Sequence, residues 1–222
     1  MLTLDGVTKT YESGQLQVTA VRNVDLEVRK ADFILIAGRS GSGKTTLLSI
    51  LGGLAKPTSG HIVLEGTDIW TLDDKALSAM RNRRIGFIFQ FPSLIPTLNV
   101  NDNLRLAASF QRVNYDVGDR AKELLELVGM SEKIKSYPNQ LSGGQLKRVA
   151  IARALMNSPE LILADEPTGD LDEETEKEIM QILKKTNENR SAIVLVSHNP
   201  NIVTFATKRF RMSDGALTQE QD

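Results

Sequence analysis

The sequence predicts an α/β protein with a mainly parallel sheet, an N-terminal antiparallel β subdomain and an inserted helical subdomain. The parallel sheet is indicated by four short segments that are apolar throughout, as strands covered on both faces are (33–37, 85–89, 161–164 and 192–196). Helical patterns separate these segments. The antiparallel subdomain is indicated by strict alternation of apolar and polar residues near the N-terminus.

Three stretches carry this alternation, which suits an antiparallel sheet with one face in water. Their apolar positions are Leu2 and Leu4, then Val24, Leu26 and Val28, and later Ile62 and Leu64. Near the C-terminus, Asp214 and Gly215 lie between two short extended pieces, which predicts a hairpin.

The stretch between Gln90 and Leu161 contains no convincing strand pattern. Residues 119–130 and 144–157 each place apolar side chains on one helical face. We therefore expect a helical lobe inserted into an α/β core. The expected organisation is one domain over residues 1–222, with the core and antiparallel lobe in 1–90 and 159–222 and the helical lobe in 91–158.

Composition sets limits on the class of protein. The chain has 222 residues, of which 41% are apolar, so it can bury a substantial core. Lys plus Arg number 27 and Asp plus Glu 28, a near-neutral balance that argues against nucleic-acid binding by bulk electrostatics. Cysteine is absent, which excludes disulfides. No apolar run is long enough to cross a bilayer and the start lacks a signal-peptide pattern, so we expect no direct membrane insertion.

Residues 38–46 (GRSGSGKTT) contain the pattern G-x-x-x-x-G-K-[ST] between a buried strand pattern and a helical one. In that context backbone N–H groups and the helix N-terminus converge on phosphate oxygens. We expect Lys44 to reach the β- and γ-phosphates of a nucleoside triphosphate and the Thr45 hydroxyl to bind Mg²⁺. The alternative is a plain turn. The expected nucleotide-binding residues are Gly38, Arg39, Ser40, Gly41, Ser42, Gly43, Lys44, Thr45 and Thr46.

A second apolar strand pattern ends at two acids, Asp165 and Glu166, followed by Pro167. Ligands of open α/β sheets bind beyond the carboxyl ends of the strands, where the phosphates are expected. Because proline restricts the preceding residue, we expect Glu166 to be extended. Asp165 would bind Mg²⁺ and Glu166 would be the general base; a solvated turn is the alternative. Gln90 and His198 also follow strand patterns, but spacing alone decides no role for them.

Together these motifs resemble the ATP-binding cassette (ABC) ATPases over the whole chain and in the family's order. LSGGQ (141–145), followed by LKRVAIARAL and LILADEPT, is close to diagnostic, and GDLD (169–172) also fits. The finer resemblance is to the macrolide-exporter, lipoprotein-releasing and cell-division subgroup. Departures from the pattern are Thr45 where Ser is commoner, Asn199 where an acid is usual, and Leu146–Lys147 where Gln is frequent.

The resemblance implies roles that spacing leaves open. Tyr11 would stack on adenine, for which its π-face is suited, although a Tyr packed at a strand end is the alternative. Gln90 would contact Mg²⁺ and water, and His198 would contact the γ-phosphate. The implied catalytic residues are Glu166, His198, Gln90 and Lys44, and the implied Mg²⁺ ligands are Thr45, Gln90 and Asp165.

The resemblance also implies a homodimer in the ATP-bound state. Two subunits would pack head to tail, so that each LSGGQ closes over the ATP held by loop 38–46 of the other subunit. This arrangement explains why one chain carries two anion-binding loops, of which only one has a lysine. The residues expected to act on the partner's nucleotide are Ser142, Gly143, Gly144, Gln145 and Asp172.

The implied activity is ATP hydrolysis that drives separate transmembrane permease subunits, for export or extraction of a lipid, lipoprotein, peptide or drug. The chain would be cytoplasmic and peripheral on the inner face of the cell membrane, with no nucleic-acid partner. Residues 91–100 would form the groove for the permease's cytoplasmic helix, or alternatively a packed loop. An alternative function is non-transport regulation of cell-wall or cell-division machinery with the same site residues.

Overall fold

The computed structural model describes residues 1–14, 16–110, 112–169 and 171–220, whose strands form two sheets. The larger sheet has six strands, which are parallel except for the last hairpin strand. Across this sheet the order is β10 (Ala216–Gln219), β9 (Lys208–Ser213), β3 (Phe33–Ala37), β8 (Ala192–Ser197), β7 (Leu161–Asp165) and β6 (Ile85–Ile88).

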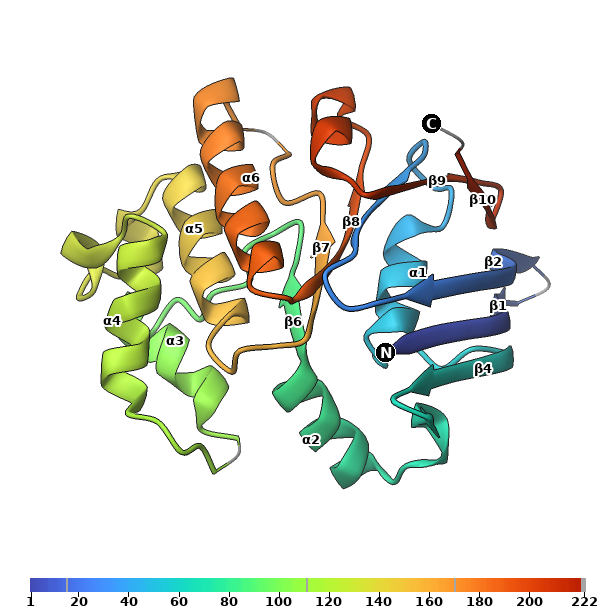
Figure 1. Ribbon diagram of the computed structural model, residues 1–222, viewed down its shortest axis with the longest axis horizontal. Coiled ribbons are helices and arrows are strands. Elements are labelled where there is room, and N and C mark those ends of the chain that lie inside the picture. The colour runs from blue at the N-terminus through green and yellow to red at the C-terminus, as the bar shows by residue number, and fades with distance from the viewer. Residues whose placement is uncertain (15, 111, 170, 221–222) are drawn as a thin grey trace.

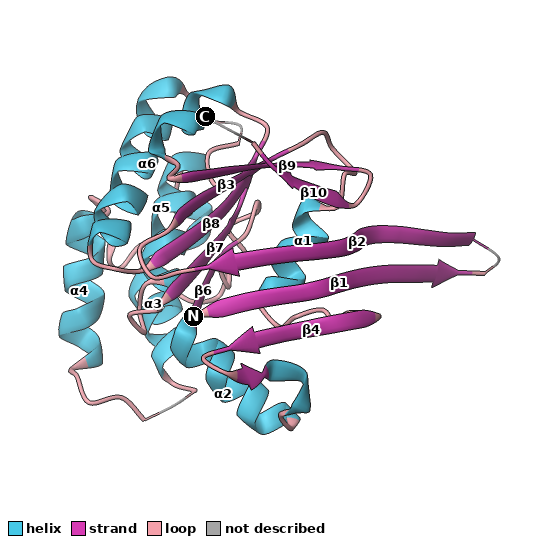
Figure 2. Ribbon diagram, turned by 45° about the vertical axis from the view of Figure 1, so that its right-hand side comes forward, coloured by secondary structure: helices cyan, strands magenta, loops and turns pink. Residues whose placement is uncertain are grey.

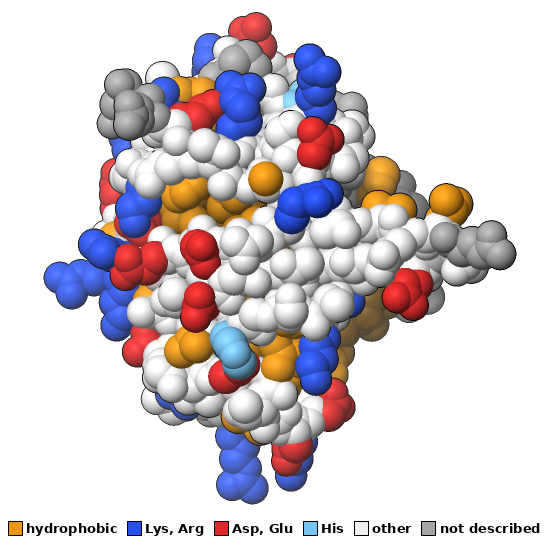
Figure 3. Space-filling model, turned by 90° about the vertical axis from the view of Figure 1, so that its right-hand side faces the viewer, with side chains coloured by type: hydrophobic (Ala, Val, Ile, Leu, Met, Phe, Trp, Pro, Cys, Tyr) orange, Lys and Arg blue, Asp and Glu red, His pale blue; other side chains and the backbone are white. Residues whose placement is uncertain are grey.

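The smaller sheet is antiparallel and contains the N-terminus. Its order is β2 (Leu16–Val28), β1 (Leu2–Ser13), β4 (Ser59–Leu64) and the short β5 (Thr67–Asp68). The alternating apolar side chains found in the sequence are buried on one face of this sheet. Figure 3 shows the molecule from this side, with charged side chains spread among polar ones and backbone. The predicted sheet with one wet face is therefore confirmed.

Helices cover both faces of the six-stranded sheet (Figures 1 and 2). Helix α1 (Lys44–Leu51) lies between this sheet and the antiparallel one, and α2 (Asp74–Arg84) leads into β6. On the opposite side, α5 (Gly143–Ala154) and α6 (Glu173–Glu188) lie next to the sheet, and α3 (Val100–Ala108) and α4 (Val117–Leu127) pack against α5. Within the described residues, no helix has both the length and the apolar character needed to cross a bilayer.

The central strands are buried on both faces, as their continuous apolar sequences predict. On β3, Phe33 and Leu35 belong to the cluster beneath the four helices, whereas Ile34 and Ile36 belong to the cluster shared with α1 and the antiparallel sheet. Each of these side chains is at most 2% exposed. At about 1.5–3 kcal/mol for each fully buried large apolar side chain, this double-sided burial stabilises the central strands.

The predicted fold class is confirmed, including a helical segment between β6 and β7 without any strand in its described residues. The C-terminal hairpin is also present, with φ of 49° at Asp214 and 81° at Gly215. One feature was not predicted: β9 pairs in parallel with β3 and so belongs to the main sheet. The division into a core and a helical lobe at residues 91 and 159 stays a prediction.

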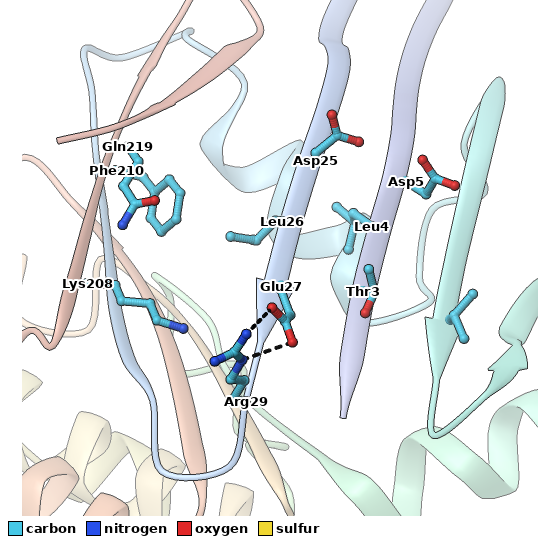
Figure 4. Close-up of a pocket in the computed structure, with 11 residues that line it drawn as sticks. Thr3, Leu4, Asp5, Asp25, Leu26, Glu27, Arg29, Lys208, Phe210 and Gln219 are labelled. Carbon is cyan, nitrogen blue, oxygen red and sulfur yellow. Dashed lines mark hydrogen bonds and ion pairs between the residues drawn. The ribbon is translucent and has the colours of Figure 1, made fainter. Parts of the chain in front are cut away.

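A hollow of about 780 Å³ lies between β1 and β2 on one side and β9 and β10 on the other (Figure 4). Leu4, Leu26 and Phe210 contribute its apolar lining. On its rim, Arg29 donates two hydrogen bonds to the Glu27 carboxylate, at 2.9 and 2.8 Å. None of the predicted site residues lines this hollow.

Candidate active site

A cavity of about 940 Å³ lies beyond the carboxyl ends of β3, β7 and β8. This is where an open parallel sheet binds its ligands. Eleven residues proposed from the sequence line it, from four separate segments of the chain: Arg39, Ser40, Gly41, Gly43, Lys44, Thr45, Thr46, Gln90, Asp165, Glu166 and His198. Gly38 and Ser42 belong to the same loop but are not among the residues that line the cavity.

Loop 38–43 fits tightly against two neighbouring strands, which explains its glycines. Gly43 has φ of 107° and precedes the first residue of α1. A Cβ at Gly43 would lie 2.0 Å from the carbonyl oxygen of Ala20 on β2, and one at Gly38 would lie 2.4 Å from that of Met212 on β9. Because carbonyl oxygens of paired strands cannot move aside, only glycine fits at both positions.

Lys44 is held inside this loop. Its ammonium donates to the carbonyl oxygens of Gly38 at 2.8 Å and Arg39 at 3.0 Å, and the residue is only 8% exposed. These contacts orient a positive charge towards the loop's centre at the N-terminus of α1, a favourable place for an anion. The Ser42 hydroxyl oxygen is buried and has no hydrogen-bond partner among the described residues.

Asp165 and Thr45 lie together at the cavity floor. Burial raises the pKa of the Asp165 carboxyl, while a hydrogen bond with Thr45 opposes the shift and the charge of Glu166 adds to it. Together with Gln90 they offer a carboxylate, a hydroxyl and an amide, which are the oxygen ligands that Mg²⁺ prefers. No group of three acidic, His or Cys residues able to hold a metal exists in the described part of the chain. A cation here needs further ligands from water or phosphate.

The Glu166 backbone differs from the sequence-based expectation. We expected an extended residue before Pro167, but Glu166 has φ of 44°, in the left-handed region. Two hydrogen bonds account for this: the Glu166 N–H donates to the Val196 carbonyl on β8, and the Gly169 N–H donates to the Glu166 carbonyl. The preference imposed by Pro167 is local and weak, so these contacts override it.

The Glu166 side chain is fixed at both oxygens. The Ser197 hydroxyl donates to Oε2 at 3.0 Å, and His198 Nδ1 forms a 2.9 Å hydrogen bond with Oε1. Asn199 adds a further layer, since its N–H donates to the Ser197 hydroxyl and its amide donates to Glu176. Ser197 and Glu176 were not identified from the sequence, although Ser197 immediately precedes His198 at the end of β8. A carboxylate held in this way is oriented to accept a proton from a ligand in the cavity.

The LSGGQ residues lie outside the cavity. The Ser142 hydroxyl accepts from the Gln145 N–H, and the Gln145 side chain accepts from the Ser142 N–H, a capping box that starts α5. Ser142 and Gly143 are exposed, and a Cβ at Gly143 would have no atom within 4 Å. This helix N-terminus therefore faces solvent in the single chain.

Two other proposed residues also lie away from the cavity. Asp172 is the N-cap of α6, where it accepts hydrogen bonds from the Thr175 N–H and hydroxyl. Tyr11 is 45% exposed on the β1–β2 ribbon, with Lys9 Nζ 4.9 Å from its ring centre. It is on the same ribbon as Ala20, which does line the cavity. Asp170, in the GDLD stretch, lies outside the described residues.

Comparison with known proteins gives a consistent result. The family model described as "ABC transporter" matches residues 21–169. An ABC transporter ATP-binding protein of Thermotoga maritima is 45% identical over 98% of this chain and 93% of its own length. A macrolide export ATP-binding/permease protein, MacB of Syntrophobacter fumaroxidans, is 42% identical over 99% of this chain but only 31% of its own length.

A solved structure agrees with these sequence matches. The dimeric, post-hydrolysis structure of the ATP-binding cassette MJ0796, bound to ADP and Pi, superimposes with a TM-score of 0.92. It is 40% identical, and the match covers 100% of both chains. The protein of that name from Methanocaldococcus jannaschii is an ABC transporter ATP-binding protein. The cavity, the family model and the shared fold lead to one conclusion: the chain belongs to the ABC transporter family and is an ATP-binding ATPase domain of that family.

Proposed function

We propose that this chain binds and hydrolyses ATP in a head-to-tail homodimer that drives separate transmembrane permease subunits. One observation carries the proposal: the cavity gathers Lys44, Asp165, Glu166 and His198, whereas loop 142–145 points its helix N-terminus into solvent outside that cavity. An exposed helix N-terminus with bare glycines suits an anion brought by another molecule. The solved structure of the related cassette MJ0796 is dimeric, which supports a dimer for this chain.

Binding of ATP would redirect Lys44. Its ammonium now rests on two loop carbonyls and would exchange them for β- and γ-phosphate oxygens, which are stronger, charged acceptors. Thr45, Gln90 and Asp165 would hold Mg²⁺, which neutralises phosphate charge. Tyr11 would stack on adenine once its ring turns towards the base.

Hydrolysis would use Glu166 as the base. Its carboxylate accepts a proton from water while the water oxygen bonds to the γ-phosphorus, and the bond from that phosphorus to the bridging oxygen of ADP breaks. The Ser197 hydroxyl keeps the base oriented through Oε2. His198, now on Oε1, would contact the γ-phosphate and thereby free that oxygen for the water.

Part of residues 91–100 would supply a surface for the permease. Phe91 is 74% exposed and Ile95 38%, whereas Leu94 packs against the core. The loop is braced from two sides: Arg153 donates to the Ser93 carbonyl at 2.7 Å, and the buried Asn103 bonds to both the N–H and the carbonyl of Ile95. A rigid loop with exposed apolar side chains fits a docking site for an amphipathic cytoplasmic helix.

This docking would place the chain in the cytoplasm, peripheral on the inner face of the cell membrane. Export or extraction of a lipid, lipoprotein, peptide or drug is the form of transport we propose. It is supported by the similarity to MacB, whose name joins macrolide export, ATP binding and a permease.

Mixed dimers test the shared site. Lys44→Ala damages the phosphate loop, and Gly143→Asp places a carboxylate where the partner's γ-phosphate should approach. Each variant alone should be nearly inactive because every site of its homodimer is damaged. In a mixed dimer both lesions fall in one site and the other site is intact. Random mixing makes half the dimers mixed, so about a quarter of wild-type sites should return.

The decisive measurement is phosphate release from the mixture, with ATP-dependent dimers shown by size-exclusion chromatography. A clear return of hydrolysis supports the shared site. If mixed dimers form and activity stays at the level of the separate variants, the head-to-tail proposal fails. A mixture of Lys44→Ala with Lys44→Ala carrying a second tag is the matched control and should stay inactive.

A further inference from the structure

Lys147 is a buried lysine outside the cavity, on the helix that begins at LSGGQ. It lies in α5 and is only 9% exposed. Burying an ammonium is costly unless it is well paired. Its surroundings therefore indicate what it stabilises.

The Lys147 ammonium contacts the turn that carries Glu166. It donates to the Gly169 carbonyl at 2.5 Å and, more weakly, to the Glu166 carbonyl at 3.5 Å. The Gly169 N–H also donates a hydrogen bond to the Glu166 carbonyl, which closes the turn 166–169. The ammonium therefore contacts the first and the last residue of this turn. Hydrogen bonds from a charged donor are roughly twice as strong as neutral ones. The left-handed backbone of Glu166 needs such support, because surrounding structure must stabilise a residue in that region.

The same helix is also packed against the start of α6. A Cβ at Gly144 would lie 2.9 Å from the Thr175 side chain, whose hydroxyl bonds to Asp172. Loop 142–145 and the turn 166–169 are thus parts of one braced unit. The N-terminus of α5 would contact the partner's nucleotide. The same helix supports Glu166, which would act on the nucleotide bound by its own chain.

We propose that Lys147 is a positioning residue for Glu166 of its own chain. It acts through the backbone of turn 166–169 and touches neither nucleotide. The proposal rests on the shared-site function above. In that function Glu166 acts on the chain's own nucleotide, whereas residues 142–145 contact the partner's nucleotide, so the two effects can be measured separately. A merely structural role in shaping loop 142–145 would affect the other site.

The experiment uses the complementing pair as its parent. Mixing Gly143→Asp with excess Lys44→Ala gives dimers whose one intact site uses Glu166 of the first chain and loop 142–145 of the second. Lys147→Met is placed in either chain. In the Gly143→Asp chain it should lower kcat roughly 10- to 100-fold, as a misplacement of about 1 Å does, with little change in KM. In the Lys44→Ala chain it should change kcat less than about threefold.

Two further variants keep the result interpretable. Lys147→Gln retains a donor and should recover kcat to within about fivefold of the parent pair, even if Lys147→Met unfolds. Lys184→Met, an exposed lysine on α6, should change nothing. Equal losses in both placements, a loss only in the Lys44→Ala chain, or no loss at all overturns the proposal.

Failure of the shared-site function gives a different signature. In that case the parent pair stays inactive although dimers form. Lys147 is then tested in the otherwise wild-type chain, where Lys147→Met must lower kcat at unchanged ATP affinity and Lys147→Gln must restore it. An unchanged kcat there rejects the positioning role independently.

Discussion

Replacing Glu166 with glutamine removes a negative charge and a proton acceptor while keeping the side-chain shape. The side chain is 12% exposed and has a hydrogen-bond partner at each oxygen. A glutamine oxygen can still accept from the Ser197 hydroxyl at the same place. Its amide can donate to His198 Nδ1 when that nitrogen is the acceptor. We therefore expect the substituted side chain to stay where it is, so that the change isolates the loss of the base.

The expected loss follows from the role of a general base. Such a group contributes about 10²- to 10⁴-fold to the rate, equivalent to about 3 to 5 kcal/mol of barrier. Nucleotide affinity should not fall, since Lys44 and Thr45 are untouched. Removal of the charge also lowers the pKa of Asp165, which burial and the neighbouring Glu166 both raise. The ionised form of Asp165, which is the form that binds Mg²⁺, is therefore favoured by the substitution.

The assay combines single-turnover phosphate release with size-exclusion chromatography in ATP. Glu166→Gln should bind ATP as tightly as the wild type or more so, hydrolyse it at least a hundredfold more slowly, and accumulate as a dimer. Glu188→Gln, an exposed acid at the far end of α6, is the matched control and should behave as wild type. Hydrolysis by Glu166→Gln within about threefold of wild type would show that the base is another residue.

Three further outcomes are expected. Gly43→Ala should lose ATP binding in a fluorescent-nucleotide titration because its Cβ meets the Ala20 carbonyl, whereas Gly143→Ala, with open space around it, should bind ATP normally as a monomer. Phe91→Asp should abolish co-purification with the membrane permease but leave the thermal midpoint and the ATPase rate of the free chain unchanged, since Phe91 is 74% exposed. NMR should give His61 a raised pKa, because its ring forms a hydrogen bond with Asp68. Asp68→Asn should lower the pKa of His61. The stabilisation from this pair is present at acidic pH and is lost as the pH rises through the pKa of His61 in the folded protein.

The sequence was a reliable guide where burial alone determines structure. Segments such as 33–37 and 192–196 are apolar at every position, and only a strand covered on both faces can bury them all. Strand β9 was missed for the opposite reason. Within Lys208–Ser213 only Met212 is buried, so the sequence shows no apolar strand pattern there. The strand is held next to β3 by backbone hydrogen bonds, which do not depend on the type of side chain.

The candidate site was predictable where one motif places several residues at once. Loop 38–46 is such a case, because strand, loop and helix are contiguous. The residues that support the base were not predictable, because Ser197 and Lys147 contact Glu166 from positions 31 and 19 residues away in the sequence. Serine at a strand end and lysine on a helix are ordinary in sequence; only the fold shows that both hold one acidic residue.

The two loops place opposite demands on the same type of residue. Gly43 has no room for a side chain and a positive φ, so its own chain explains why it is glycine. Gly143 has open space and no positive φ, and glycine at a helical position costs about 1 kcal/mol relative to alanine. Nothing within the described chain therefore requires glycine there. A ligand that approaches the backbone closely from outside does, and the partner's nucleotide is the ligand that the head-to-tail dimer would bring to it.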